Sequence, residues 1–337
     1  MSVPVAQYDS AVLASHRAPV LLPDPSAEPG FSPAPRTGRA AQLTRTVPRE
    51  FVHRAAVAEV LLTGWRRETD TTFRLAAQWP RSHSFYAPVL GLYHDPLLAG
   101  ETIRQAGLLL SHAEFGVSLG DQFLMSALEF TVVPRHTRVA AAPADLDLRV
   151  TCNDIRLRGR RLAGMRIDVV IERGGELAVY GSAEFSVISG PAYRKLRGDR
   201  PRISRVPVAD PVPAGTVGRA FPKDVVLSAT HRPRRWQLRL DTGHPVLFDH
   251  RVDHAPGMLL IEAARQATLA LVPCDGYLPV TVRSRFDRYA ELDSPHWIEA
   301  APIAYRGDGR TGVEITGSQD SETVFTCAVE AIPAPAR

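Results

Sequence analysis

Two glutamates lie inside strongly apolar stretches of the chain, where a carboxylate is costly to bury. The stretch FDHRVDHAPGMLLIEAARQA contains Glu262, and the stretch PLLAGETIRQAG contains Glu101. A buried carboxylate must be paired, hydrogen-bonded or directed into a cavity. Arg265 and Arg104 follow the two glutamates at the third position, so on a helix each pair could be a simple salt bridge. Because the same pair occurs in both stretches, we favour a functional cleft that contains at least one of the glutamates.

Pro256 and Gly257 come directly before the apolar run that holds Glu262. Proline suits the first turn of a helix, and glycine allows a ligand to approach the backbone closely. The unpaired N–H groups of a helix start can polarise a carbonyl group or stabilise an oxyanion. This step therefore predicts an oxyanion-binding helix start just over one turn before Glu262.

Several histidines precede the two glutamates and are candidates for proton transfer. They are His83, His94, His244, His250 and His254. His254 and His250 rank highest because they adjoin the Pro–Gly step. Asp249 and Asp253 could orient these histidines or could cap the helix. The sequence leaves the choice among the histidines open.

The elements that carry these residues form an internal repeat. The residues His83, Glu101, Arg104 and Gln105 recur 161 positions later as His244, Glu262, Arg265 and Gln266. Four polar identities at one separation and in one order indicate a duplication. We therefore expect equivalent positions for these residues in two similar halves.

Each half has the same predicted layout. Two short strands and a loop lead to one apolar helix, at 96–112 in the first half and 256–272 in the second. Strand-like runs follow each helix, with the glycines at 174–175 and the GDG segment at 307–309 as turns. A helix that is apolar on nearly all sides is buried. The pattern predicts an α+β double hotdog, in which each antiparallel sheet wraps around a central helix.

The repeats divide the chain into four segments. Residues 1–45 are rich in Pro, Ala and Ser, and we expect a poorly ordered tail. The first hotdog repeat covers 46–190, and the second covers 221–337. Prolines and arginines without apolar periodicity mark 191–220 as a linker.

Composition limits the location of the protein and its partners. The 337 residues carry a formal net charge of +4, and the basic residues are mostly arginine, which suits two-pronged binding of phosphate or carboxylate. Cys152, Cys274 and Cys327 lack metal-type spacing, so we expect a reducing cytoplasm and no metal site. We find no signal peptide and no apolar run long enough to span a membrane.

Four basic clusters could contact a partner. They are RLRGRR at 156–161, RPRISR at 200–205, RPRR at 232–235 and RSRFDR at 283–288. Most are expected to be solvated, and one could dock an acidic carrier protein. None interleaves with aromatic residues, so we expect no nucleic-acid partner. No phosphate-cradling or Rossmann glycine pattern occurs, so we expect no cofactor.

The PG-x4-E-x3-Q pattern at 256–266 resembles that of the β-hydroxyacyl-carrier-protein dehydratases. Those hotdog enzymes pair a glutamate on the central helix with a histidine in the preceding loop. Glu262 and Gln266 match this pattern, but Phe248 occupies the position of the histidine, and His250 follows two residues later. The departure argues against a dehydratase mechanism.

A longer resemblance covers nearly the whole folded chain. The sequences VHRAAVAEVLLTGW, AAQWPRSHSFY, HDPLLAGETIRQAG, FGVSLGDQFLM and FDHRVDHAPGMLLIEAARQA resemble, in this order, the A-factor-synthase (AfsA) family of actinobacteria. These tandem hotdog proteins make γ-butyrolactone or butenolide signalling molecules. The resemblance implies an acyltransferase that moves a β-ketoacyl group from acyl carrier protein to the hydroxyl of dihydroxyacetone phosphate. The ester can then close to a phosphorylated butenolide by intramolecular aldol condensation.

That chemistry gives the candidate residues their roles. A base is needed for the hydroxyl, and Glu262 or Glu101 could serve if burial raises its pKa. The helix start at Gly257 or Gly100 would stabilise the oxyanion, and an arginine next to the glutamate would clamp the phosphate. The catalytic candidates are Glu262, Glu101, His254 and His250, and the substrate-binding candidates are Arg265, Arg104, Gln266, Gln105, Gly257, His83 and His244. The second repeat is favoured as the active half because it keeps the Pro–Gly step.

Two other functions stay open at this point. A hotdog dehydratase or thioesterase would act on acyl thioesters without dihydroxyacetone phosphate. A lactone-binding regulator or inactive scaffold would bind its ligand without turnover and would be indifferent to Glu262→Gln. The sequence does not fix the acyl chain, the final product, or whether the protein is a monomer or a homodimer.

Overall fold

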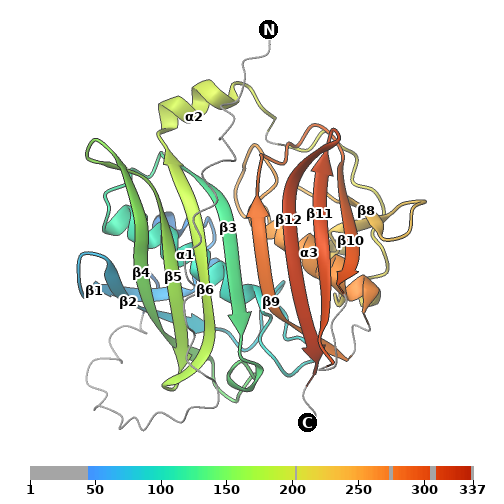
Figure 1. Ribbon diagram of the computed structural model, residues 1–337, viewed down its shortest axis with the longest axis horizontal. Coiled ribbons are helices and arrows are strands. Elements are labelled where there is room, and N and C mark those ends of the chain that lie inside the picture. The colour runs from blue at the N-terminus through green and yellow to red at the C-terminus, as the bar shows by residue number, and fades with distance from the viewer. Residues whose placement is uncertain (1–44, 202, 273–275, 304–308, 335–337) are drawn as a thin grey trace. The chain divides into compact units, whose positions relative to one another are not determined.

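The computed structural model describes residues 45–201, 203–272, 276–303 and 309–334 (Figure 1). The predicted tail at 1–45 and the predicted turn at 307–309 lie almost entirely outside these residues. The first half contains β1 (Leu62–Arg67), β2 (Thr72–Trp79), α1 (Leu97–Ala113), β3 (Gln122–Val132), β4 (Ala144–Arg158), β5 (Arg161–Arg173) and β6 (Glu176–Ile188). Short 3-10 helices lie at η3 (Arg49–Val52), η4 (Val57–Glu59) and η5 (Pro134–His136).

The second half repeats this order after a short helix, α2 (Gly190–Arg197). It contains the 3-10 helices η6 (Ala214–Val217) and η7 (Pro222–Asp224), then β7 (Leu227–Ala229), β8 (Arg235–Leu238), α3 (Gly257–Leu271), β9 (Tyr277–Phe286), β10 (His296–Ile303), β11 (Thr311–Gln319) and β12 (Glu322–Pro333). Both central helices begin and end within one residue of the bounds predicted from the sequence.

The twelve strands of the described residues belong to one antiparallel sheet with the order β1-β2-β4-β5-β6-β3-β9-β12-β11-β10-β8-β7. The second half of this order mirrors the first, because β7, β8, β9, β10, β11 and β12 take the places of β1, β2, β3, β4, β5 and β6. β3 and β9 join the halves, and Figure 1 shows them side by side. The hydroxyls of Thr131 and Thr281 lie 3.1 Å apart across this seam, and the Ser284 hydroxyl donates to the Leu128 carbonyl at 2.7 Å. The predicted double hotdog is confirmed.

Alternation of apolar and polar residues explains which face of each strand is buried. Along β5, Ile167, Val169 and Ile171 are buried, while Arg166 and Asp168 form an ion pair on the other face. Gly174 and Gly175 have φ of 66° and 92°, which is the left-handed backbone that a tight hairpin between β5 and β6 requires. The predicted glycine turn is confirmed.

The two central helices are buried because the sheet of each half packs against them. α1 contacts β3 and β6, and α3 contacts β9, β10, β11 and β12. Gly100 allows α1 to approach the sheet closely, since a Cβ atom there would lie 2.8 Å from the Phe130 ring. Glu101 and Glu262 are therefore held inside the core and are 1% and 0% exposed.

The second repeat has a counterpart for residues that come before the first strand. VPREFVHRA at 47–55 and VPAGTVGRA at 212–220 share Val, Pro, Val, Arg and Ala at a separation of 165 residues. Pro48 and Pro213 have the same backbone angles, φ −54° and ψ 126°, and each begins a 3-10 helix. The segment predicted as a linker, 191–220, thus contains α2 and the start of the second repeat.

Candidate active site

Glu262 on α3 is the centre of a buried ion cluster. Arg219 donates from Nε to Oε1 of Glu262 at 2.8 Å, and its Nη2 lies 2.7 Å from Oε2. Arg265 donates two further hydrogen bonds, at 2.8 and 2.7 Å, and Gln266 donates from its amide. Three side chains therefore hold one carboxylate, and the Glu262 side chain has no exposed surface.

Glu101 on α1 has the same arrangement. Arg54 donates from Nε at 3.0 Å, Arg104 donates at 2.9 and 2.8 Å, and Gln105 donates at 2.7 Å. The residues at corresponding places in the two clusters are Arg54 and Arg219, Arg104 and Arg265, and Gln105 and Gln266. The sequence-predicted Glu–Arg–Gln sets are thus brought together, each with one additional arginine.

Both glutamates are held in the ionised state. Burial raises the pKa of each carboxyl, but the two neighbouring guanidinium groups lower the pKa more, and the net pKa is about 2. The condition for a general base, a raised pKa at Glu262 or Glu101, is therefore not met. A carboxylate that binds a proton this weakly and is shared by two arginines is poorly suited to general-base catalysis.

The two glutamines bind the protein's own backbone. Gln105 accepts from the Leu61 N–H at 2.9 Å and donates to the Glu59 carbonyl at 2.8 Å. Gln266 makes the same two contacts with Val226 and Asp224, both at 2.9 Å. These bonds fix the chain that leads into β1 and β7 above each cluster.

His83 and His244 have both ring nitrogens occupied. In each, Nδ1 accepts from two backbone N–H groups, those of Phe85 and Tyr86 for His83 and those of Val246 and Leu247 for His244. Nε2 of each lies 3.3 Å from a carboxylate, on Glu59 and Asp224 respectively. Because Nδ1 accepts and Nε2 faces a carboxylate, both rings are held in place by the loops they support.

The additional arginines tie each repeat to the other. Arg54 of the first repeat donates to the Val246 carbonyl at 3.1 Å, and Arg219 of the second donates to the Phe85 carbonyl. Val246 follows Phe85 at the repeat separation of 161 residues, so the two contacts are equivalent. Sequence reasoning missed these arginines, although the shared VPxxxVxRA pattern could have revealed them.

His254 lies next to a carboxylate that three side chains support. Its Nδ1 is 2.8 Å from Oδ1 of Asp253, which also accepts from the Tyr193 hydroxyl at 2.6 Å. Arg197 donates to the second oxygen at 3.1 Å. Burial raises the pKa of Asp253, but these hydrogen bonds lower it more, so the carboxylate stays charged. Since Asp253 accepts from Nδ1, the His254 Nε2 carries the lone pair, and the side chain is 27% exposed.

Arg197 of α2 fixes this pair against the second repeat. It donates to both oxygens of Glu291 at 2.7 Å and to the Asp253 carbonyl at 2.9 Å. Its guanidinium lies 4.1 Å from the centre of the Tyr289 ring, which in turn packs edge-on against His254 at 5.0 Å. α2 therefore positions the Asp253–His254 pair, which lies just before α3.

The start of α3 carries open backbone donors. No side chain caps it, and the N–H groups of Leu259 and Leu260 bond to the Pro256 carbonyl. Within the described part of the chain, the structure gives no acceptor for the N–H groups of Gly257 and Met258. A Cβ atom at Gly257 would lie 3.3 Å from the Phe286 ring and 3.7 Å from Met125, so the glycine lets these apolar side chains approach the helix start.

At the start of α1, by contrast, the first three backbone N–H groups have acceptors. The Asp95 carboxylate accepts from the Leu97 N–H at 2.9 Å, and the next two N–H groups bond to backbone carbonyls. α1 begins at Leu97, so the expectation that Gly100 forms a helix start is wrong. His94, which precedes α1, is 3% exposed, burial lowers its pKa to about 4, and its Nε2 has no partner in the described structure.

His250 lies at the other end of the loop that holds His254. Its side chain is 46% exposed, and Nδ1 is 3.6 Å from Asp249. Asp249 accepts from the backbone N–H groups of Ala55 and Ala56 at 2.5 and 3.1 Å, so this loop of the second repeat is fastened to the first.

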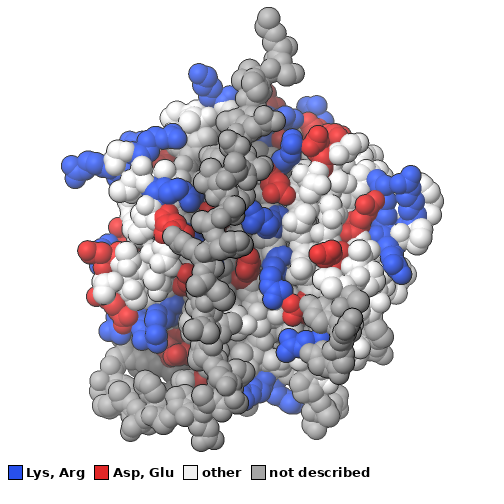
Figure 2. Space-filling model, in the orientation of Figure 1, with Lys and Arg blue, Asp and Glu red and all other residues white. Residues whose placement is uncertain are grey.

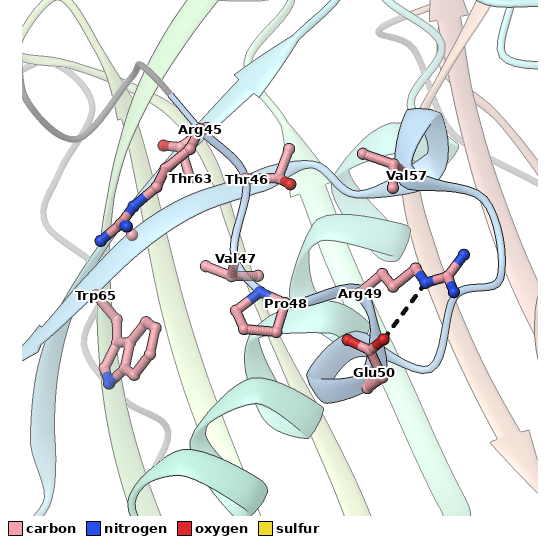
Figure 3. Close-up of a pocket in the computed structure, with 10 residues that line it drawn as sticks. Arg45, Thr46, Val47, Pro48, Arg49, Glu50, Val57, Thr63 and Trp65 are labelled. Atoms are coloured by element: carbon pink, nitrogen blue, oxygen red, sulfur yellow. Dashed lines mark hydrogen bonds and ion pairs between the residues drawn. The ribbon is translucent and has the colours of Figure 1, made fainter.

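A pocket of about 720 Å³ lies beside η3 and β1 (Figure 3). It is lined by Arg45, Thr46, Val47, Pro48, Arg49, Glu50, Val57, Thr63, Gly64 and Trp65. None of the predicted site residues lines it, and Arg49 faces Glu50 within it.

Among the residues that the structure describes, no group of three His, Cys, Asp or Glu side chains could hold a metal ion. No helix in these ranges is long and apolar enough to cross a bilayer.

Comparison with known proteins gives an independent result. The family model of the A-factor biosynthesis hotdog domain matches residues 36–189 and 203–333. A 2-oxo-3-(phosphooxy)propyl 3-oxoalkanoate synthase from Streptomyces virginiae is 58% identical over 288 residues, which are 85% of this chain and 98% of the relative. A synthase of the same name from Streptomyces griseus subsp. griseus is 41% identical over 304 residues, 90% and 96% of the two chains. An acyl-ACP thioesterase structure from Bacteroides thetaiotaomicron shares 12% identity, with a TM-score of 0.48 over 77% of this chain and 97% of that one.

Proposed function

The chain belongs to the A-factor biosynthesis hotdog family, and on this basis we propose that it esterifies dihydroxyacetone phosphate with a 3-oxoalkanoyl group. The product named for its relatives, a 2-oxo-3-(phosphooxy)propyl 3-oxoalkanoate, is that ester. In the reaction, the hydroxyl oxygen attacks the thioester carbon, and the thiol leaves with the proton that the hydroxyl gives up. The ester is the precursor of a γ-butyrolactone or butenolide.

His254 is the general base of this reaction. Its Nε2 carries the lone pair because Asp253 accepts from Nδ1, and the side chain is partly exposed. A base oriented by a carboxylate is a recurring device for activating a hydroxyl. Nε2 takes the proton from the hydroxyl and returns it to the leaving thiolate. The aspartate stays ionised and stabilises the imidazolium between the two transfers.

The N–H groups of Gly257 and Met258 stabilise the oxyanion. They are the open donors at the start of α3, three and four residues after His254. Such a pair of backbone donors at a helix start suits the negative charge that develops on a thioester oxygen. Phe286 and Met125 beside Gly257 provide an apolar surface for the acyl chain. Glu262 and Glu101 are scaffold residues that keep the two central helices and the loops of the opposite repeat in place.

The acyl donor is a thioester on acyl carrier protein, an acidic partner. Basic side chains of the described surface are candidates for its docking. Figure 2 shows that they are distributed among acidic and uncharged residues on the viewed face and do not form one continuous patch. A single chain supplies both repeats, so a monomer has all the residues of the site.

The observation that carries the proposal is the Asp253–His254 pair next to the open helix start, in a member of this family. Mass spectrometry of the purified protein with a 3-oxoalkanoyl thioester, with and without dihydroxyacetone phosphate, tests it. We expect a phosphorylated ester or butenolide that His254→Gln reduces by about 10²- to 10⁴-fold. His231→Gln, which removes an exposed imidazole from a turn, serves as the control. Free acid or enoyl product that does not depend on the phosphate would instead indicate the thioesterase or dehydratase alternative.

A further inference from the structure

The two buried clusters share their Glu–Arg–Gln contacts, but Arg219 also lies 3.6 Å from Asp95, and the clusters differ in access. The Arg265 side chain is 1% exposed, whereas that of Arg104 is 18% exposed. Arg104 uses Nε and Nη2 for Glu101 and the Val52 carbonyl, and Nη1 has no acceptor among the described residues. Because Glu101 is shared with Arg54, the cluster of the first repeat keeps one uncompensated positive charge and one open donor.

One pair of equivalent positions next to the two clusters also differs. His53 and Gly218 are equivalent positions, and both have left-handed backbone, with φ of 51° and 68°. A Cβ atom at Gly218 would lie 2.7 Å from Leu269 and 3.5 Å from Nη1 of Arg265, so the second repeat has no room for a side chain there. The first repeat places an imidazole at this point, in a conformation that is unfavourable for a residue other than glycine. Such local strain is often found at functional sites.

A second histidine orients His53. Nδ1 of His112 is 2.8 Å from the Val117 carbonyl and must therefore carry a proton. Nε2 of His112 lies 2.9 Å from Nε2 of His53, so His53 donates across this contact when both rings are neutral. Phe123 packs edge-on against both rings at 5.3 Å. When both rings are neutral, Nδ1 of His53 carries the lone pair and can only accept; when His112 is protonated, it donates through Nε2, and Nδ1 of His53 becomes a donor.

The surroundings of His53 favour negative charge. Burial lowers the pKa of His53 to about 3, and the nearby Arg104 guanidinium and the His112 and His250 rings lower it as well. Burial, the largest cause, disfavours charge of either sign, whereas the Arg104 guanidinium, which repels a proton, attracts an anion. The carboxylates close by are already engaged, since Glu101 binds two arginines and Asp249 binds two backbone N–H groups.

The second repeat also contributes to this region. His250 comes from its loop, and the positions equivalent to Asp249 and His250 in the first repeat are Pro88 and Val89. One side of the molecule therefore has His53, Asp249 and His250 where the equivalent side has Gly218, Pro88 and Val89. His250 and His254 are four residues apart, which limits the distance between their Cα atoms to about 14 Å. The two histidines therefore belong to one short loop.

From these contacts we infer that Arg104, His53 and His250 form the subsite for the phosphate group of dihydroxyacetone phosphate, with His112 orienting His53. The inference rests on the proposed function and places the phosphate in the first repeat, opposite the base and the helix start of the second. Arg104 offers the open donor, and His250 offers a partly exposed imidazole from the other side. The equivalent Arg265 is too buried to take this role.

His53→Gly is the decisive variant, because glycine occupies the equivalent position in the second repeat with the same backbone conformation. It removes the imidazole and relieves strain, so the fold is retained. His250→Gln changes a partly exposed side chain, and His231→Gln is the matched control. Titration with glycerol 3-phosphate, followed by calorimetry and without any thioester, measures the subsite directly. We expect both variants to raise the Kd by about 10- to 100-fold and the control to leave it unchanged.

Kinetics separate this inference from the proposed function. Where the ester is formed, His53→Gly should raise KM for dihydroxyacetone phosphate and leave KM for the thioester unchanged. The ratio of kcat/KM for dihydroxyacetone phosphate to kcat/KM for dihydroxyacetone, which lacks the phosphate, should fall by a similar factor. Glycerol 3-phosphate binding that is absent in the wild type, or equal in wild type and both variants, would overturn the subsite. Binding that weakens as expected in a protein that forms no ester would support the subsite and refute the acyltransferase.

Discussion

At the scale of single residues, the two buried glutamates have a structural role that can be measured. Each carboxylate is paired with two guanidinium groups inside the protein, and removing one partner of a buried ion pair leaves further uncompensated charge. Glu262→Gln should therefore lower the free energy of unfolding by about 3–5 kcal/mol, measured by urea denaturation. Glu299→Gln, in the exposed pair with Arg235, should change it by less than about 1 kcal/mol. Equal effects in the two variants would contradict the scaffold role.

The same carboxylates predict how stability depends on pH. The pKa of Glu101 and Glu262 in the folded protein is about 2, below the ordinary value of 4.5. A lowered pKa means that their contribution is complete above the ordinary value and is lost as the pH falls toward 2. Melting temperatures measured from pH 6 to pH 2 should fall steeply below about pH 4.5 in the wild type. Glu262→Gln should show a shallower fall, and a parallel curve would refute the assignment.

The residues themselves show what the sequence could reveal. The glutamates, arginines and glutamines were found because they recur at one separation on a recognisable helix. The direction of the pKa shift could not be found, since it depends on Arg54 and Arg219, which are distant in the sequence and reach the clusters through loops. His254 was correctly grouped with Asp253 by adjacency, but the support from Tyr193 and Arg197 required the folded structure.

At the scale of elements, α2 is the part that sequence patterns described least well. Prolines and arginines with no apolar periodicity predicted a linker, yet eight residues form a helix whose Arg197 and Tyr193 hold Asp253. The helix is fixed by these tertiary contacts, and no pattern within its own sequence indicates them. The strands and central helices were predictable because their apolar residues follow the periods of two and 3.6 that a sheet and a buried helix impose.

This role of α2 leads to a prediction for catalysis. Tyr193→Phe removes one hydrogen bond to the Asp253 carboxylate and keeps the ring, so the base should be oriented less firmly. A hydrogen bond to a charged group contributes about 1.5–3 kcal/mol, and we expect kcat to fall by about 10-fold while the melting temperature changes little. Arg194→Gln on the exposed side of α2 is the control, assayed for ester formation under the same conditions. An unchanged kcat in Tyr193→Phe would show that α2 does not position the base.

At the scale of the whole molecule, the halves work as unlike partners within one sheet. β3 and β9 join them, and Arg54 and Arg219 each bind a loop of the opposite repeat. The helix start is open in the second repeat and capped in the first, whereas the arginine is accessible in the first and buried in the second. The fold could be predicted from the repeat, but this division of labour could not, because it depends on which equivalent positions face solvent.

The separation between equivalent residues changes from 165 before the first strand to 161 after the second, so the β7–β8 hairpin is four residues shorter than its counterpart. An assembly of two identical chains encoded by one gene inherits every deletion and substitution in both copies. A hairpin shortened in one copy only therefore records a time when the two copies were already inherited as separate sequences. From that time, substitutions in one repeat no longer appeared in the other, so selection could improve one cleft while the equivalent cleft lost the same chemistry.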